Sequence, residues 1–339
     1  MVKTTLAIFL LCAALSAQRI DVQPSVYYRT FSHSHPILKR IEPGQHVFTR
    51  TLDSGGQDEK SEHRHPVPGN PLNGPFYVES AEPGDAIEVQ FHRMRLNRNW
   101  GYSAYRLGLY SLTPESIEGL YPNRYKPDLI RKGSASIVPW DIDLEHNTVR
   151  LREPSSAKIK LEFPTRPMLG CVGVAPVGDF APTSAPAGSY GGNLDYNRVG
   201  EGASVILPVS HAGAYLFMGD GHAMQADGEP TGTGVETSMD VEFSVLVHKK
   251  ANVTGPRVIT ADAIISIGAQ PEFASSLDRA LQMATSDMAR WLTKEYGIEP
   301  WAAHLLIGAQ GKYEVVTVAG SMALVIPKKY LPVLTEPRP

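Results

Sequence analysis

The segment Glu82-Pro-Gly-Asp-Ala-Ile-Glu-Val-Gln-Phe91 joins a turn to a strand, and this unit recurs along the chain of 339 residues. Pro and Gly form the turn, and apolar and polar side chains then alternate, as in a half-buried β-strand. The 30 glycines and 27 prolines are scattered, which favours many short strands joined by turns. Further strands are expected at residues 148–151, 159–163, 204–209, 241–248, 257–267 and 315–325. The sequence therefore predicts a mainly β protein.

The C-terminal part has a different pattern. Apolar residues recur at three- and four-residue spacing from Ser275 to Tyr296, which predicts an amphipathic helix that ends at Gly297. A second short helix is expected to begin at Ile298. We therefore expect a β-rich part over residues 18–270 and an α+β tail over residues 271–339.

Residues 1–17 have the features of a secretory signal peptide. Lys3 precedes an apolar run from Leu6 to Leu15, and a cleavage site is expected before Gln18. The run is too short to span a membrane. The alternatives are a lipoprotein signal at Cys12 and a buried N-terminal helix. The signal predicts a secreted or periplasmic protein that is not held in a membrane after processing.

The sequence features typical of several functional classes are absent from this chain. Signal removal leaves Cys171 as the single cysteine, so an internal disulfide is excluded. The net charge is −3 without a basic stripe, so we expect no nucleic-acid partner. Neither a Gly-x-Ser-x-Gly nucleophile elbow nor a phosphate-binding or dinucleotide-binding loop is present.

The most polar glycine-rich segment, Gly219-Asp-Gly-His-Ala-Met-Gln-Ala-Asp-Gly-Glu-Pro-Thr-Gly-Thr-Gly-Val-Glu236, is the strongest candidate for a functional site. Its glycines bend the backbone, so we expect a loop and not an ordinary core strand or helix. Asp220 and His222 are two residues apart, and in an extended backbone both side chains would project to the same face. Carboxylate and imidazole groups held close together are typical of a metal site or a hydrolytic centre.

Three further clusters combine acidic residues with glycine, proline or asparagine. They are the segments 51–57, 70–85 and 191–195, which contain Asp53, Glu79 and Asp195 respectively. Asp53 could equally close a turn, and Glu79 could be a solvated strand residue. The two glycines and the asparagine before Asp195 can form a backbone nest that donates N–H bonds.

Two His-x-His pairs suggest a different class of protein. The pairs are His33 with His35 and His63 with His65, and such a pair on a strand can bind a transition metal, as in cupins. Prolines follow His65 closely, which favours a loop. A secreted cupin-like metal oxygenase that uses His63 and His65 is one alternative, and a non-catalytic β-sandwich binding module is another.

Taken in order, these clusters resemble the acetamidase/formamidase family. The matching motifs are Glu42-Pro-Gly44, Thr51-Leu-Asp53, Asn70-Pro71, Gly74-Pro75, Tyr77-Val-Glu79, Ala81-Glu-Pro-Gly-Asp85, Gly173-Val-Ala-Pro176, Gly191-Gly-Asn-Leu-Asp195, Leu207-Pro-Val209, Gly219-Asp-Gly-His-Ala223 and Asp227-Gly-Glu229. The resemblance implies a β-sandwich-like body with a smaller α+β C-terminal part. It also implies a homo-oligomeric enzyme that hydrolyses the C–N bond of small linear amides, such as formamide or acetamide, and releases ammonia. The chain departs from the family in its export signal and in Ala226, where glycine is expected.

Amide hydrolysis needs an activated water and a stabilised carbonyl oxygen. A divalent ion can supply both, because it lowers the pKa of a bound water from about 15.7 to about 7. We expect Asp195, Asp220 and His222 to be ligands, with Asp53 as the next candidate. The imidazole favours Zn²⁺, whereas a set made only of oxygens would favour Ca²⁺.

The leaving amine must also receive a proton. Glu79 or Glu236 is expected to act as general base and then as general acid. The backbone N–H groups of Gly192 and Asn193 are expected to stabilise the oxyanion.

Overall fold

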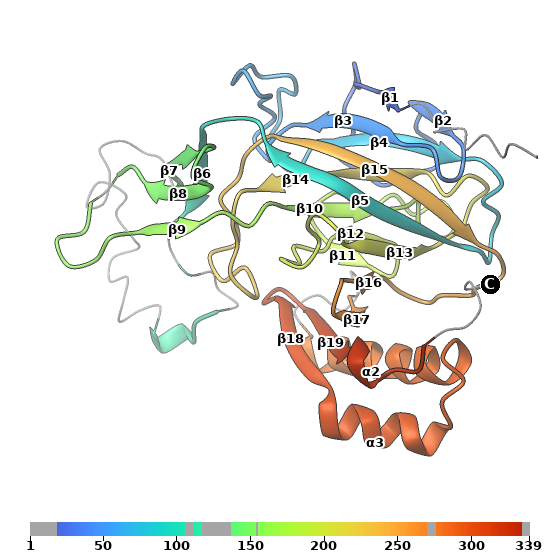
Figure 1. Ribbon diagram of the computed structural model, residues 1–339. Coiled ribbons are helices and arrows are strands. Elements are labelled where there is room, and N and C mark those ends of the chain that lie inside the picture. The colour runs from blue at the N-terminus through green and yellow to red at the C-terminus, as the bar shows by residue number, and fades with distance from the viewer. Residues whose placement is uncertain are drawn as a thin grey trace, which may run out of the picture.

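Two large β-sheets packed face to face form the body of the protein (Figure 1). The structure is a computed structural model, and it describes residues 19–105, 107, 111–116, 137–153, 155–269 and 276–333. The predicted signal peptide therefore lies outside the described residues. Within them, no helix combines the length and apolar character needed to cross a membrane.

The first sheet has nine strands and continues from the sandwich into the C-terminal part. Its order is β1 (Ile20–Asp21), β3 (Val47–Thr51), β15 (Met239–His248), β5 (Ala86–Leu96), β13 (Ser204–Pro208), β16 (Arg257–Ile259), β17 (Ala263–Gly268), β19 (Ser321–Pro327) and β18 (Lys312–Thr317). All neighbours are antiparallel except β1 and β3.

The second sheet has six strands. Its order is β11 (Ala187–Gly188), β12 (Gly191–Asn193), β10 (Met168–Gly173), β14 (Leu216–His222), β4 (Leu72–Val78) and β2 (Lys39–Ile41). A smaller sheet of four strands lies to one side of the sandwich: β6 (Trp100–Ala104), β7 (Ile137–Asp143), β8 (Thr148–Leu151) and β9 (Glu162–Pro164) (Figure 1).

The main hydrophobic core fills the space between the two large sheets. Phe76 of β4 and Phe243 of β15 meet there edge to face, with ring centroids 5.2 Å apart, and both are fully buried. Aromatic pairs in this geometry add about 0.5–1.5 kcal/mol to the effect of burial alone. The sandwich is therefore held by apolar side chains that alternate along strands of both sheets.

The C-terminal helices α2 (Leu277–Lys294) and α3 (Pro300–Gln310) cover the far end of the nine-stranded sheet, and the short 3₁₀ helix η3 (Lys328–Tyr330) follows β19 (Figure 1). Ser276 begins α2, because its side chain accepts a hydrogen bond from the Arg279 N–H. The apolar side of α2, which includes Trp291, lies in a second core cluster with residues of β17 and β19. Ser266 of β17 also donates to the Ala284 carbonyl at 2.7 Å.

The predicted fold class, a β-sandwich-like body with a smaller α+β C-terminal part, is confirmed. Two predicted strands are each split in two. The range 257–267 is interrupted by a turn in which Thr260 Oγ1 donates to Asp262 Oδ1, and the range 315–325 is interrupted at a turn that contains Gly320.

The expectation that residues 219–236 avoid a core strand is wrong for their first four residues. Gly219 to His222 form the end of β14, which lies near the centre of the six-stranded sheet. The glycines fit this strand because a side chain would not. A Cβ atom on Gly219 would lie 2.8 Å from the Pro71 carbonyl oxygen, and one on Gly221 would lie 2.9 Å from the Thr237 oxygen.

Candidate active site

Strand β14 carries two of the candidate ligands into the protein interior. Asp220 and His222 are 3% and 1% exposed, so both side chains are removed from bulk solvent. The backbone of Asp220 has a φ of 62°, in the left-handed region that Asp tolerates better than most residues. His222 Nε2 lies 3.6 Å from Asp220 Oδ1.

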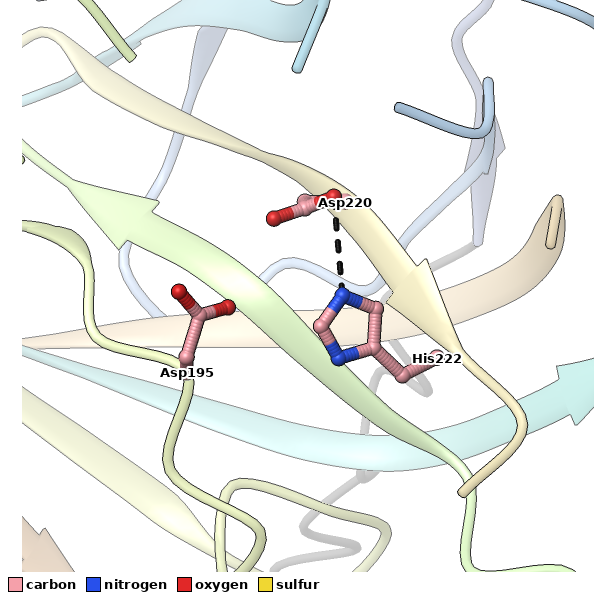
Figure 2. Close-up of side chains that lie close together, drawn as sticks. All are labelled: Asp195, Asp220 and His222. Carbon is pink, nitrogen blue, oxygen red and sulfur yellow. Dashed lines mark ion pairs between the residues drawn. The ribbon is translucent and has the colours of Figure 1, made fainter. Parts of the chain in front are cut away.

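Asp195 reaches the same place from the turn that follows β12. Its N–H group donates to the Gly170 carbonyl of β10 at 3.2 Å, and its backbone has a φ of 45°. Figure 2 shows the carboxylate pointing toward the space that Asp220 and His222 also face. One potential ligand atom from each of the three residues lies within 4.8 Å of the other two. The structure thus brings together three of the four predicted metal ligands.

Two glutamates from the following loop adjoin this group. His222, Glu229 and Glu236 form a second cluster whose ligand atoms also lie within 4.8 Å of one another. Glu236 Oε1 lies 3.1 Å from His222 Nε2 and accepts a hydrogen bond from the Gly234 N–H at 3.0 Å. Glu236, predicted as one of two possible general bases, is therefore in position beside the candidate ligands. Glu229 was not among the predicted site residues.

Several acidic groups are buried around one imidazole, and this shifts the pKa values of both the acidic groups and the imidazole. Burial, with the Asp220 carboxylate adding to it, raises the pKa of Asp195 to about 8. Burial likewise raises the pKa of Glu236 to about 7, although His222 opposes the shift. Burial lowers the pKa of His222, but Glu236 and Asp220 together raise it well above its usual value. The cluster therefore favours bound positive charge.

Four buried polar atoms of this cluster make no hydrogen bond within the described part of the chain. They are Asp195 Oδ1, Asp220 Oδ1, His222 Nε2 and Glu236 Oε2. Leaving such a group unsatisfied costs about 1–3 kcal/mol, and more when it is charged. A divalent cation would satisfy carboxylate oxygens and an imidazole nitrogen together, and this mixed donor set suits Zn²⁺. The residues present therefore fit the predicted metal, and its identity remains a prediction.

Two asparagines hold the aspartates in place. Asn70 Nδ2 donates to Asp220 Oδ2 at 2.9 Å and to Asn193 Oδ1 at 3.1 Å, and Asn193 Nδ2 donates to Asp195 Oδ2. The buried Cys171 thiol also donates to Asn193 Oδ1, at 2.9 Å. Burial raises the pKa of Cys171 well above its usual value, and the two aspartates add to the shift, so it remains a neutral thiol.

Sequence reasoning missed two glycines that make room for the site. A Cβ atom on Gly170 would lie 2.6 Å from Asp220 Oδ2 and closer still to Asp195 Oδ1. A Cβ atom on Gly234 would lie 2.5 Å from His222 Nδ1. Glycine at both positions therefore lets the backbone approach the side chains of the candidate ligands. The sequence signal was present for Gly234, which lies in the glycine-rich segment, and was missing for Gly170 inside an apolar strand.

Asp53 does not join the cluster, which corrects its prediction as a ligand. Arg98 Nη2 donates to Asp53 Oδ2 at 2.7 Å, and the Gln57 N–H donates to Asp53 Oδ1 at 2.9 Å. Both partners of the ion pair are almost fully buried. The two oxygens of Asp53 are therefore already bound by the protein.

Glu79 lies outside the site as well. It follows the C-terminal end of β4, whereas Asn70 lies near the other end, and strands rise about 3.3 Å per residue. Its carboxylate accepts from Arg40 at 3.0 Å on a partly exposed surface. Its proposed role as general base is thus not supported by its position.

The predicted oxyanion donors belong to the sheet. The Asn193 N–H donates to the Pro186 carbonyl at 3.2 Å, so it is not free to bind an oxyanion. Gly192 is paired with Val172 of β10 on one side and with Ala187 of β11 on the other. Asn193 contributes through its side chain instead.

The histidine pair of the cupin-like alternative lies in a loop. His63 is exposed, and His65 Nδ1 contacts the Val67 carbonyl at 2.6 Å. Neither histidine takes part in a potential metal cluster among the described residues.

Comparison with known proteins agrees with this fold. A model of the Acetamidase/Formamidase family matches residues 174–278, which include Asp195, Asp220, His222 and Glu236. Over these residues, the chain is similar to the acetamidase/formamidase family.

Individual relatives are similar over different lengths. "Putative formamidase C869.04" of Schizosaccharomyces pombe is 27% identical over 247 residues, which cover 61% of this chain and 60% of the relative. The match thus spans less than two thirds of that protein. The crystal structure of an acetamidase from Yersinia enterocolitica has a TM-score of 0.75 at 26% identity and covers 94% of both chains. A predicted acetamidase/formamidase from Thermoanaerobacter tengcongensis has a TM-score of 0.72 at 25% identity, over 92% of this chain and 96% of that one.

Proposed function

We propose that this protein hydrolyses the C–N bond of small linear amides and releases ammonia with the help of a divalent cation. The family and the names of its relatives support amide hydrolysis. The observation that carries the metal assistance is the set of four buried nitrogen and oxygen atoms that make no hydrogen bond within the described residues, on Asp195, Asp220, His222 and Glu236.

Asp195, Asp220 and His222 would hold the cation, with Zn²⁺ as the ion that fits best. When bound, such an ion acts as a Lewis acid and makes a water nucleophilic at neutral pH. The protein contributes rigidity, because two ligands lie on a central strand and hydrogen bonds from Asn70 and Asn193 fix the aspartate carboxylates.

Glu236 is the proposed general base. The Gly234 N–H fixes Oε1, whereas Oε2 is buried without a hydrogen-bond partner. This oxygen can take a proton from the attacking water and then deliver it to the leaving amine. Efficient proton transfer of both kinds needs a pKa near the working pH.

The confined site favours small substrates. Asp195, Asp220, His222 and Glu236 are at most 3% exposed, so a bulky acyl group would have to displace packed protein. We therefore propose formamide- or acetamide-sized amides as the substrate class.

The test is ammonia release from a panel of short amides, measured on purified protein with and without a chelator. His222→Ala should lose bound metal and turnover together while keeping the fold, as judged by circular dichroism. Glu79→Gln, which alters an acidic residue outside the cluster, is the matched control and should keep the parental rate. Hydrolysis by His222→Ala at the parental rate would show that the site is assigned wrongly.

We also propose that the mature chain acts outside the cytoplasm, because residues 1–17 have the pattern of an export signal. Mass spectrometry of the N-terminus in the exported fraction should find a chain that begins at Gln18. An intact Met1 on the active protein would contradict this.

A further inference from the structure

A glutamine that the proposed function has not used connects two of the candidate ligands. Gln225 lies three residues after His222 and is 6% exposed. Its Oε1 lies 2.7 Å from His222 Nδ1, and its Nε2 donates to the Asp195 carbonyl oxygen at 2.5 Å. One amide group thus joins the strand that carries His222 to the turn that carries Asp195.

These contacts fix which way the amide faces. A backbone carbonyl oxygen can only accept, so the NH₂ group of Gln225 must point to Asp195. The amide oxygen then faces His222, and because this oxygen also only accepts, His222 Nδ1 must carry a hydrogen. In the neutral imidazole, the lone pair therefore lies on Nε2.

Nε2 is the nitrogen that faces the acidic cluster. It lies 3.1 Å from Glu236 Oε1 and 3.6 Å from Asp220 Oδ1, and neither contact has hydrogen-bond geometry. Metal-binding histidines usually donate their other N–H to a neighbouring acceptor, which fixes the tautomer and the ring orientation. Gln225 supplies such an acceptor and at the same time restrains the backbone of a second ligand.

We infer that Gln225 is a positioning residue that presents His222 Nε2 and the Asp195 carboxylate to a divalent cation. This inference rests on the proposed metal-assisted function. Gln225 touches neither the cation nor the substrate, and its effect is carried by the orientation of the two ligands. Loss of such a partner typically weakens metal affinity by about 10–100-fold.

The experiment compares Gln225→Met with Gln90→Met in the full chain. Methionine keeps the side-chain length and removes both hydrogen bonds. Gln90 is a matched control on β5, because it also makes two side-chain hydrogen bonds, to Glu88 and Ser244, away from the cluster. Zn²⁺ affinity is measured by competition with a chromophoric chelator. The proton chemical shift of the His222 Nδ1–H, assigned from the signal lost in His222→Ala, reports whether this hydrogen is hydrogen-bonded in the Zn²⁺-loaded protein.

We expect Gln225→Met to bind Zn²⁺ about 10–100-fold more weakly than the parent and to move the Nδ1–H proton signal upfield, because the hydrogen-bond acceptor is lost. Gln225→Glu should restore that signal, because a carboxylate oxygen can still accept from Nδ1. Gln90→Met should match the parent in both measurements.

Two results would overturn the inference alone: a Zn²⁺ affinity of Gln225→Met within threefold of Gln90→Met, or an unchanged His222 signal in Gln225→Met. A parent protein that hydrolyses amides at an undiminished rate after a chelator has removed divalent cations would instead overturn the metal-assisted function on which the inference depends.

Discussion

The replacement Gly170→Ala should damage the candidate site while leaving the fold intact. Gly170 lies in β10, and its backbone lies outside the left-handed region, so alanine is conformationally allowed there. The added methyl group would lie 2.6 Å from Asp220 Oδ2. To reach an ordinary contact of 3.4 Å, this oxygen must move by about 0.8 Å.

The size of this displacement sets the expected loss of catalytic activity. Metal–ligand distances are defined to about 0.2 Å, and a displacement of about 1 Å can reduce catalysis by about 100-fold. This loss corresponds to about 2.7 kcal/mol of transition-state stabilisation. The global stability should change less, because the lower entropy of the unfolded chain, worth about 0.4–1 kcal/mol, offsets part of the cost of about 1–3 kcal/mol for the added methyl group.

The assay measures kcat/KM for ammonia release, Zn²⁺ affinity and urea unfolding. Gly255→Ala is the matched control, because Gly255 is also buried, and its nearest neighbour to an added Cβ is the Ile267 oxygen at an ordinary 3.5 Å. A Gly170→Ala protein with parental metal affinity and turnover would refute the reasoning. A protein that loses activity only because it unfolds would refute it too.

Two further predictions concern charged groups outside the cluster. Arg98→Met should destabilise the protein by about 3–5 kcal/mol in urea unfolding, because it leaves the buried Asp53 carboxylate without its cation; a loss below about 1 kcal/mol would contradict this. Burial alone would raise the pKa of Glu314, but hydrogen bonds, chiefly from Arg198, lower it to about 2. A lowered pKa in the folded state stabilises the protein above the unfolded value of 4.5, and this stabilisation is lost as the pH falls toward 2. Between pH 7 and pH 3 the parent should therefore lose about 2 kcal/mol more unfolding free energy than Glu314→Gln, and equal losses would show that Glu314 is not responsible.

Local patterns predicted the strands well where turn residues mark their ends. The predicted range 148–151 coincides with β8, and the range 204–209 differs from β13 by one residue. The range 257–267 was predicted as one strand because its turn contains Thr260 and Asp262 without glycine or proline. The side-chain hydrogen bond between these two residues stabilises the turn, and only the structure reveals it.

Only part of the candidate site was predicted, because only some of its residues lie close together in sequence. Asp220 and His222 are two residues apart on one strand, so their proximity follows from local geometry. The role of Asp53 depends on Arg98, which is 45 residues away in sequence, and no local pattern shows that the two pair in the interior. Gly170 and Gln225 act through contacts with distant segments, so their contribution could be recognised only after folding had brought those segments together.

The left-handed backbone at Asp195 and Asp220 restricts which mutations these positions can accept. Asparagine would keep the backbone conformation but remove the negative charge, whereas glutamate would keep the charge on a side chain less suited to that conformation. Neither single replacement preserves both properties. Substitutions at these two positions are thus restricted by the backbone conformation and also by the charge that the proposed cation site requires.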